Sequence, residues 1–155
     1  MEIQIGDIGH IIQLAIAPVF LLTGVGTNLT VLTNRLARII DRSRKVDERI
    51  QNGSQAEQVD ARRELDILYR RAHLISSAIT LSTSCALLVC VVIAALFVGH
   101  LTNLGLSRFI AGLFIIAMLA LIGSFIYLLR EILIATRTMW MHKIVLAGQD
   151  QGGIK

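Results

Sequence analysis

The stretch that decides the fold runs from residue 8 to residue 50. Residues 8–34, IGHIIQLAIAPVFLLTGVGTNLTVLTN, contain no Asp, Glu, Lys or Arg, and residues 35–50, RLARIIDRSRKVDERI, turn abruptly basic. One continuous helix accommodates both halves. Backbone amides in hydrocarbon must bond within their own segment, and the basic half leaves the bilayer on the side that retains positive charge. The stretch therefore predicts an integral membrane protein.

Three apolar blocks account for the composition of the chain. Of its 155 residues, 54% are hydrophobic and 17% are charged, whereas soluble domains carry about 25% charged residues. The blocks cover residues 8–32, 74–99 and 109–129, and each is close to the roughly 20 residues that cross a bilayer. We predict an all-α membrane protein, one domain over residues 1–155, with three transmembrane helices at about 8–33, 74–99 and 109–130.

Residues 34–73 are predicted to extend the first two spans into an antiparallel helical hairpin. Apolar residues recur there at alternating spacings of three and four, the pattern of helices that pack at a shallow angle. The two runs are Leu29, Leu32, Leu36, Ile39, Ser43, Val46 and Ile50, and Ala61, Leu65, Leu68, Ala72, Ile75 and Ile79. At the tip, Gly53 suits a left-handed residue. Ser54 and Glu57 suit a capping box, in which the hydroxyl meets the third amide of the new helix and Glu57 reaches back.

Two further features modify the spans. Pro18 lacks a backbone donor, so we predict a kink near it in the first span. Residues 131–147 are predicted to continue the third span as a C-terminal interfacial helix, anchored by Trp140, His142 and Lys143.

The positions of the basic residues predict the orientation. Ten of the fifteen Lys and Arg residues lie within 35–71 and four lie after residue 129, which leaves only Arg108 on the other side. The positive-inside rule then puts the N-terminus outside and both the hairpin and the C-terminus in the cytoplasm. Because the basic residues flank apolar blocks, the pI of about 9.6 indicates contact with membrane lipid, and no nucleic-acid partner is expected.

No pattern of residues points to catalysis, a metal or a cofactor. The chain lacks a Gly-rich phosphate loop and a nucleophile elbow, and its four His residues have no metal-ligand spacing. None of the apolar blocks contains the charged residue that coupled transporters use. Cys85 and Cys90 are interpreted as small packing residues. We expect no enzyme activity, no metal site and no cofactor.

Three stretches of the chain resemble a known family. They are residues 12–26, IQLAIAPVFLLTGVG, residues 34–42, NRLARIIDR, and the Arg-Arg-Ala-His run at 70–73. They are similar to a family of small bacterial membrane proteins identified only as domain of unknown function 2721. The resemblance covers nearly the whole chain and implies a three-span protein of the bacterial inner membrane. It implies no reaction, ligand or binding residue.

Polar stripes mark two of the predicted spans. Thr23, Thr27, Thr30 and Asn34 share one face of the first helix, with Gln13 and Phe20 further along it. His73, Ser77, Thr80 and Ser84 form a stripe of the same spacing at the start of the second span. Both stripes occupy the cytoplasmic halves of consecutive antiparallel spans. They can be packing contacts between helices, or bonds to their own carbonyls, without any further function.

Two functional hypotheses follow. In the first, the chain is a homo-oligomeric ion channel or pore lined by the first-span stripe, with Phe20 as a constriction and Arg35, Arg38 and Arg42 at the cytoplasmic mouth. Self-association is expected because three spans cannot easily enclose a pore and because Gly112, Ala120, Gly123 and Ser124 allow close helix approach. In the alternative, the chain is a non-conducting scaffold or adaptor whose hairpin binds a cytoplasmic protein.

Overall fold

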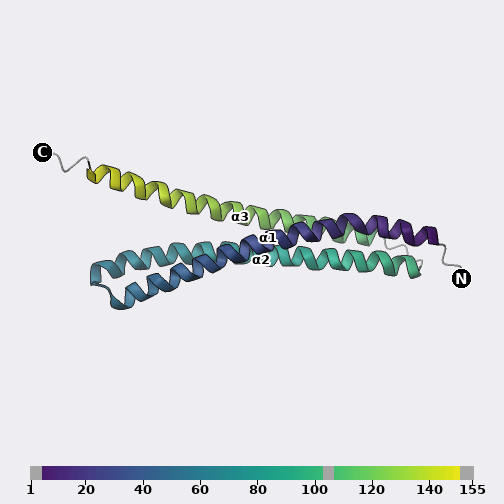
Figure 1. Cartoon of the computed structure of the whole chain (residues 1–155), viewed down its shortest axis with the longest axis horizontal. Helices are drawn as coiled ribbons and strands as arrows, with labels where there is room; N and C mark the ends of the chain where they lie inside the picture. The colour runs from purple at the N-terminus through teal and green to yellow at the C-terminus, as the bar shows by residue number, and fades with distance from the viewer. Residues whose placement is uncertain (1–4, 103–106, 151–155) are drawn as a thin grey trace.

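The chain folds into three long helices that run up, down and up. The computed structural model describes the backbone of residues 5–102 and 107–150, and the side chains of residues 12–55, 57–99 and 107–136. The helices are α1 (Ile5–Asn52), α2 (Gln55–Thr102) and α3 (Ser107–Asp150), and α2 packs along both of the others (Figure 1). α1 passes through Pro18 and Arg35 without a break. This confirms the predicted continuous helix, whereas a kink at Pro18 stays a prediction.

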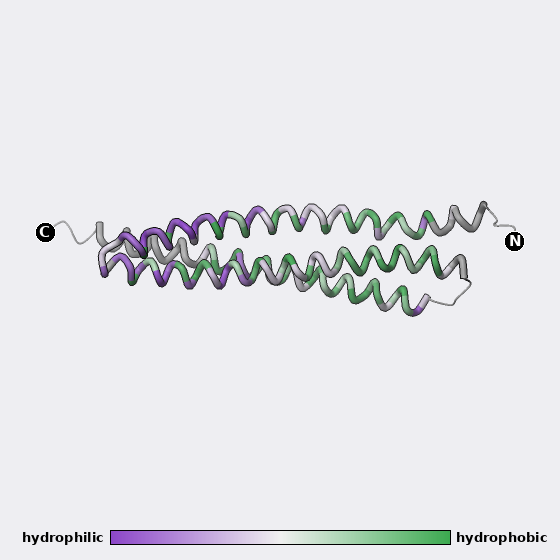
Figure 2. Tube along the Cα trace, turned by 90° about the horizontal axis from the view of Figure 1, so that it is seen from below, coloured by the Kyte–Doolittle hydropathy of each residue, from purple (hydrophilic) through white to green (hydrophobic). Residues whose placement is uncertain are grey.

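All three helices are long and apolar enough to cross a membrane, within Ile12–Asn52, Glu57–Gly99 and Ser107–Thr136. Hydrophobic residues dominate the end of the bundle nearer the N-terminus, and hydrophilic residues gather at the other end, toward the tip of the hairpin that joins α1 to α2 (Figure 2). Large apolar side chains on the spans, such as Phe20, Ile115 and Leu119, are more than half exposed. Such a surface suits lipid and would be a liability in water. The chain is therefore an integral membrane protein.

α1 and α2 meet along a seam that repeats every seven residues. The buried positions are Pro18, Val25, Leu32, Ile39 and Val46 on α1, and Ala61, Leu68, Ile75, Ser82 and Val89 on α2. Leu36, Ile50, Leu65, Ala72 and Ile79 pack against this seam from partly buried positions. An exact repeat of seven is typical of helices that stay in contact at a shallow angle over many turns. The two predicted apolar runs and the antiparallel hairpin are confirmed.

The tip of the hairpin differs in detail from its prediction. Gly53 does not adopt a left-handed conformation. A Cβ atom there would instead lie 2.7 Å from the carbonyl oxygen of Arg49, whose helix ends with the bond from the Gly53 amide at 2.9 Å. Glycine is thus required by the close approach of backbone, not by a positive φ. Any larger residue has to displace the last turn of α1.

The capping box at the tip is half formed as predicted. Glu57 reaches back and accepts from the Ser54 amide at 2.8 Å, but the Ser54 hydroxyl also donates to the same carboxylate oxygen at 2.8 Å. Both bonds favour the ionised carboxylate, so the Ser54 amide and then its hydroxyl lower the pKa of Glu57. A lowered folded-state pKa stabilises the tip above the ordinary glutamate pKa. That contribution is lost as the pH falls through the lowered value.

The end of α3 leaves the hairpin. We use "the arm" for residues 132–150, which continue α3 as helix to Asp150. The C-terminal end of α3 diverges from α1 and α2, although it points toward the same end of the molecule as the tip of the hairpin (Figure 1). Trp140, His142 and Lys143 lie outside the side chains that the structure describes, so the predicted interfacial anchor stays a prediction.

Candidate functional site

A buried polar network joins the three helices within the membrane-spanning region. The side-chain amide of Asn28 on α1 donates to the hydroxyl of Ser82 on α2 at 2.9 Å and lies 3.5 Å from that of Ser124 on α3. Ser82 and Ser124 share a bond of 2.8 Å, and Ser124 also donates to the carbonyl oxygen of Ala78 at 2.9 Å. Because no water competes in hydrocarbon, these bonds hold the three helices in one register.

A charged cluster lies further toward the hairpin. The Glu131 carboxylate on α3 is 1% exposed and accepts from Arg35 of α1 at 2.5 Å. Its second oxygen accepts two bonds from Arg71 of α2, at 2.8 and 3.0 Å. Two guanidinium groups and one carboxylate leave a net charge of +1, carried by arginine side chains that are partly exposed. Every helix contributes one charge, so the cluster fastens all three at one level.

The network and the cluster form two layers in the same heptad register. Asn28 and Arg35 are seven residues apart, as are Ala78 and Arg71, and Ser124 and Glu131. Seven residues of helix correspond to a separation of about 10.5 Å. Arg35 and Arg71 bound the uncharged stretches of α1 and α2, and Glu131 follows Arg130, which bounds that of α3. The cluster therefore lies at the hairpin-side end of all three uncharged stretches.

Neither layer was predicted from the sequence. The three charges lie just outside the apolar blocks, and Asn28, Ser82 and Ser124 lie on three different helices and form no stripe of their own. A signal in the sequence existed only for Ser82, which lies seven residues after Ile75 of the predicted apolar run. Asn28 is not spaced by sevens from the run on its own helix, and no run was predicted for the helix that carries Ser124 and Glu131.

The first-span stripe lies on the surface of the chain. Thr23, Thr27 and Thr30 are exposed, and at about 100° per residue their face is opposite the seam of Val25 and Leu32. Each hydroxyl donates to the carbonyl four residues earlier in α1, at 3.5, 3.1 and 3.1 Å. The remaining members, Gln13, Phe20 and Asn34, are also exposed. Within the described residues, no hydrogen bond joins a side chain of the stripe to another helix.

The second-span stripe also faces away from the seam. His73 and Thr80 are exposed, and Ser77 and Ser84 are half-buried. The hydroxyls of Ser77 and Thr80 bond back to the carbonyls of His73 and Ser76, both at 3.0 Å. The fold therefore does not bring the two stripes together, and Asn28, Ser82 and Ser124 supply the polar contact between helices instead.

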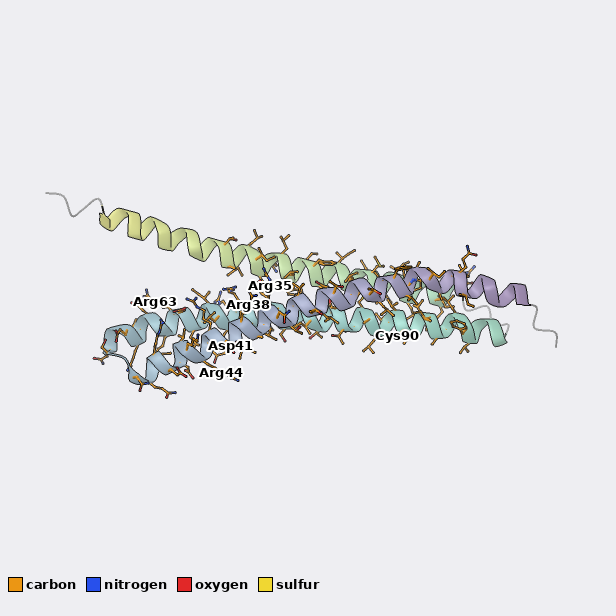
Figure 3. All side chains as sticks on the ribbon, in the orientation of Figure 1. Arg35, Arg38, Asp41, Arg44, Arg63 and Cys90 are labelled. Atoms are coloured by element: carbon orange, nitrogen blue, oxygen red, sulfur yellow. The ribbon has the colours of Figure 1, made fainter. Side chains whose placement is uncertain are left out.

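Two of the three predicted mouth residues already have partners within the chain. Arg35 binds Glu131 in the cluster, and Arg42 binds Glu64 of α2 through two nitrogens at 2.6 and 2.8 Å. Arg38 is exposed and borders a hollow on the hairpin (Figure 3). Some of the basic residues after the first span therefore join α1 to the other two helices of the same chain.

Small residues of α3 are also used within the chain. A Cβ atom at Gly123 would lie 3.2 Å from Leu81 of α2, and Ser124 is fully buried against α2. Gly112, in contrast, has no heavy atom within 4 Å of that position. Gly123 and Ser124 therefore let α2 and α3 approach each other, and they no longer support self-association.

The hairpin carries a hollow between α1 and α2 near its tip. Its volume is about 850 Å³, and a second hollow of about 320 Å³ adjoins it through Lys45, Arg49 and Glu64. We call the two together "the hairpin groove". Its lining residues on α1 and α2 are Arg38, Asp41, Arg42, Lys45, Val46, Glu48, Arg49, Asn52, Gly53, Glu57, Asp60, Ala61 and Glu64. No three His, Cys, Asp or Glu side chains within the described ranges could hold a metal ion.

Comparison with known proteins agrees with the sequence resemblance. The family model described as "Protein of unknown function (DUF2721)" matches residues 15–141. No curated protein and no solved structure matches the chain.

Proposed function

Because the chain belongs to the DUF2721 family, whose description states no activity, we propose a function from its own geometry: a homo-oligomeric ion channel lined by α1. The proposal keeps the predicted location, a bacterial inner membrane with the hairpin and the C-terminus in the cytoplasm. It involves no enzymatic step.

The observation that carries the proposal is the position of the α1 hydroxyl stripe. Thr23, Thr27 and Thr30 are exposed on the face that the fold leaves unused, and Gly24 and Gly26 beside them have open space above their backbone. In a membrane this face meets either lipid or other copies of α1. Small and hydroxyl-bearing residues let transmembrane helices approach closely, which favours other copies.

The hydrogen bonds of the stripe suit a path for cations. Each of the three hydroxyls uses its proton on a carbonyl of its own helix, so only oxygen lone pairs point outward. Rings of such oxygens around an axis can replace part of the hydration shell of a cation. Phe20, 73% exposed on the same side of α1, would narrow the path toward the other surface.

The Thr27→Leu variant is expected to lose at least about tenfold of the cation flux of the reconstituted protein, because an apolar ring at this level dewets the path. Flux is measured in liposomes that contain the purified full chain. Thr33→Leu is the matched control: Thr33 is exposed on α1 and also bonded to its own helix, but it lies about 100° away from the centre of the stripe. Its flux should stay within about twofold of wild type. Absence of flux in the wild type, or equal flux in Thr27→Leu, contradicts the channel.

A scaffold or adaptor is the second candidate, and a different observation favours it. Ile40, Val59 and Tyr69 are large apolar residues of the hairpin that are 41%, 54% and 62% exposed. None of them lines the groove. Apolar residues exposed outside a membrane favour a protein partner. Affinity capture with the wild-type chain should then recover a partner that is lost with the triple variant Ile40→Ser, Val59→Ser, Tyr69→Ser; recovery of the same proteins by both chains rules this candidate out.

A further inference from the structure

We propose that the hairpin groove is the docking site of the arm. Residues 132–150 then alternate between the diverging position seen here and a docked position along α1 and α2 of the same chain. This inference does not depend on the channel. It concerns a movement within one subunit.

The groove continues the contact that α3 already makes with α1 and α2. α3 touches α1 at Asn28 and Arg35, and the next positions in this heptad are Arg42 and Arg49, which line the groove. On α2 the corresponding series runs from Ala78 and Arg71 to Glu64 and Glu57, which line it as well. The groove is therefore the same flank of the same two helices, two heptads beyond the charged cluster.

The arm continues the seam through which α3 packs on the other two helices. α3 packs through Ala117, Ser124 and Glu131, spaced by sevens and all buried. The same register continues through Thr138 and Val145, with Ile134 and Met141 at the intermediate positions, and no Gly or Pro interrupts residues 124–147. A seam that alternates spacings of three and four is the pattern of a helix that packs on others. The arm thus has a packing face at the positions that the groove would meet.

Length and charge match as well. From the charged cluster, the hairpin extends from Arg35 to Asn52 and the arm from Glu131 to Asp150, which is about 26 and 28 Å of helix. The larger hollow is lined by four acidic residues, Glu48, Glu57, Asp60 and Glu64, and by two basic ones, Lys45 and Arg49. The smaller hollow is lined by four basic and two acidic residues, so the excess of negative charge lies in the larger part of the groove. The charged residues of the arm are Arg137, Lys143 and, at its end, Asp150. Opposite charges thus favour the docked position, more strongly at low salt.

Docking requires α3 to curve toward the hairpin beyond Glu131. Long helices curve gently without a break, and the cluster at Glu131 holds the start of the arm against both neighbours. Curvature spread over residues 132–150 would bring the far end of the arm onto the hairpin. The volume of the groove, about 850 Å³ in its larger part, leaves room for side chains of a helix.

Disulfide trapping of the full chain tests the proposal. The background is Cys85→Ala with Cys90→Ala, and the trapping pair is Arg49→Cys with Val145→Cys. Arg49 lines the groove. Arg49 and Val145 each lie 14 residues beyond the charged cluster, counted from Arg35 on α1 and from Glu131 on α3. A disulfide needs Cβ atoms about 4 Å apart, so the pair reports only the docked position. We expect oxidation in lipid bilayers to link the two within one chain about tenfold faster than the control pair Arg44→Cys with Val145→Cys. Arg44 projects from the outer side of α1, away from α3 (Figure 3).

Several outcomes would overturn the proposal. Equal rates of disulfide formation for the two pairs exclude docking of the arm in the groove. Links that form only between co-expressed single-cysteine copies assign the groove to the arm of another subunit. Brominated lipids that quench Trp140, the single tryptophan of the chain, as strongly as they quench a lipid-bound peptide would place the arm on the bilayer surface. Spin labels at the same two cysteines, without disulfide formation, should show a short-distance population that declines with added salt; its absence also rejects docking.

Discussion

Glu131→Gln is expected to destabilise the folded chain by about 3–5 kcal/mol, the usual cost of removing one partner from a buried ion pair. Glu131 is 1% exposed and accepts from both Arg35 and Arg71. The variant leaves two guanidinium groups close together at the edge of the hydrocarbon with no carboxylate between them. α3 loses its charged attachment to both α1 and α2. Thermal unfolding of the purified chain in lipid nanodiscs measures the loss.

The control for this prediction is the ion pair between Arg42 and Glu64. It has similar distances, but its side chains are 67% and 32% exposed. Glu64→Gln should therefore cost no more than about 1 kcal/mol, as pairs near solvent do. Combining Glu131→Leu with Arg35→Met and Arg71→Met should recover most of the stability, because an apolar cluster removes the unpaired charge. If Glu131→Gln and Glu64→Gln unfold at the same temperature, the cluster does not fasten the helices.

Ser124→Leu is expected to be the second most damaging change, with a loss of about 1–3 kcal/mol from overpacking alone. The Ser124 side chain is fully buried and its hydroxyl contacts Ser82, Asn28 and the Ala78 carbonyl. A leucine would force α2 and α3 apart where Gly123 and Leu81 already lie close together. It would also remove hydrogen bonds worth about 0.6 kcal/mol each in a membrane.

Two variants separate these effects. Ser124→Ala keeps the close approach and loses only the hydroxyl, so it should cost about 1–2 kcal/mol. Thr80→Leu places the same new side chain on the exposed face of α2 and should leave the unfolding temperature within the error of the measurement. A Ser124→Leu chain as stable as Thr80→Leu would contradict the packing of α3 described here.

The sequence predicted those parts of the fold that depend on local composition and on period. An uncharged run followed by Arg35 and Arg38 requires a spanning helix, because backbone groups in lipid have no other partner. The runs through Leu32, Ile39 and Val46, and through Ala61 and Leu68, predicted the hairpin because two helices with a repeat of seven bury the same side throughout. These predictions needed no knowledge of a third helix.

The candidate site could be predicted only in part, because period does not distinguish an inward face from an outward one. Thr27 and Asn28 are neighbours in sequence, and both are polar residues in an apolar span. The spacing of Thr23, Thr27 and Thr30 predicted a polar face on the first span, yet Asn28 is the residue that bonds to α2 and α3. Which side is buried depends on where the other helices lie, and Ser124, the α3 residue that Asn28 meets, is 96 residues away in sequence.

The amino-acid sequence by itself determined that this protein is a membrane protein with three spans and an antiparallel helical hairpin, since hydrocarbon allows a backbone of this composition few other forms. Only the tertiary structure decided which polar groups are used up in holding it together. Asn28, Ser124 and Glu131 meet partners that are distant in sequence, and the energy of a buried polar group depends on those partners. The Thr stripe and the hairpin groove stay open because α3 covers neither.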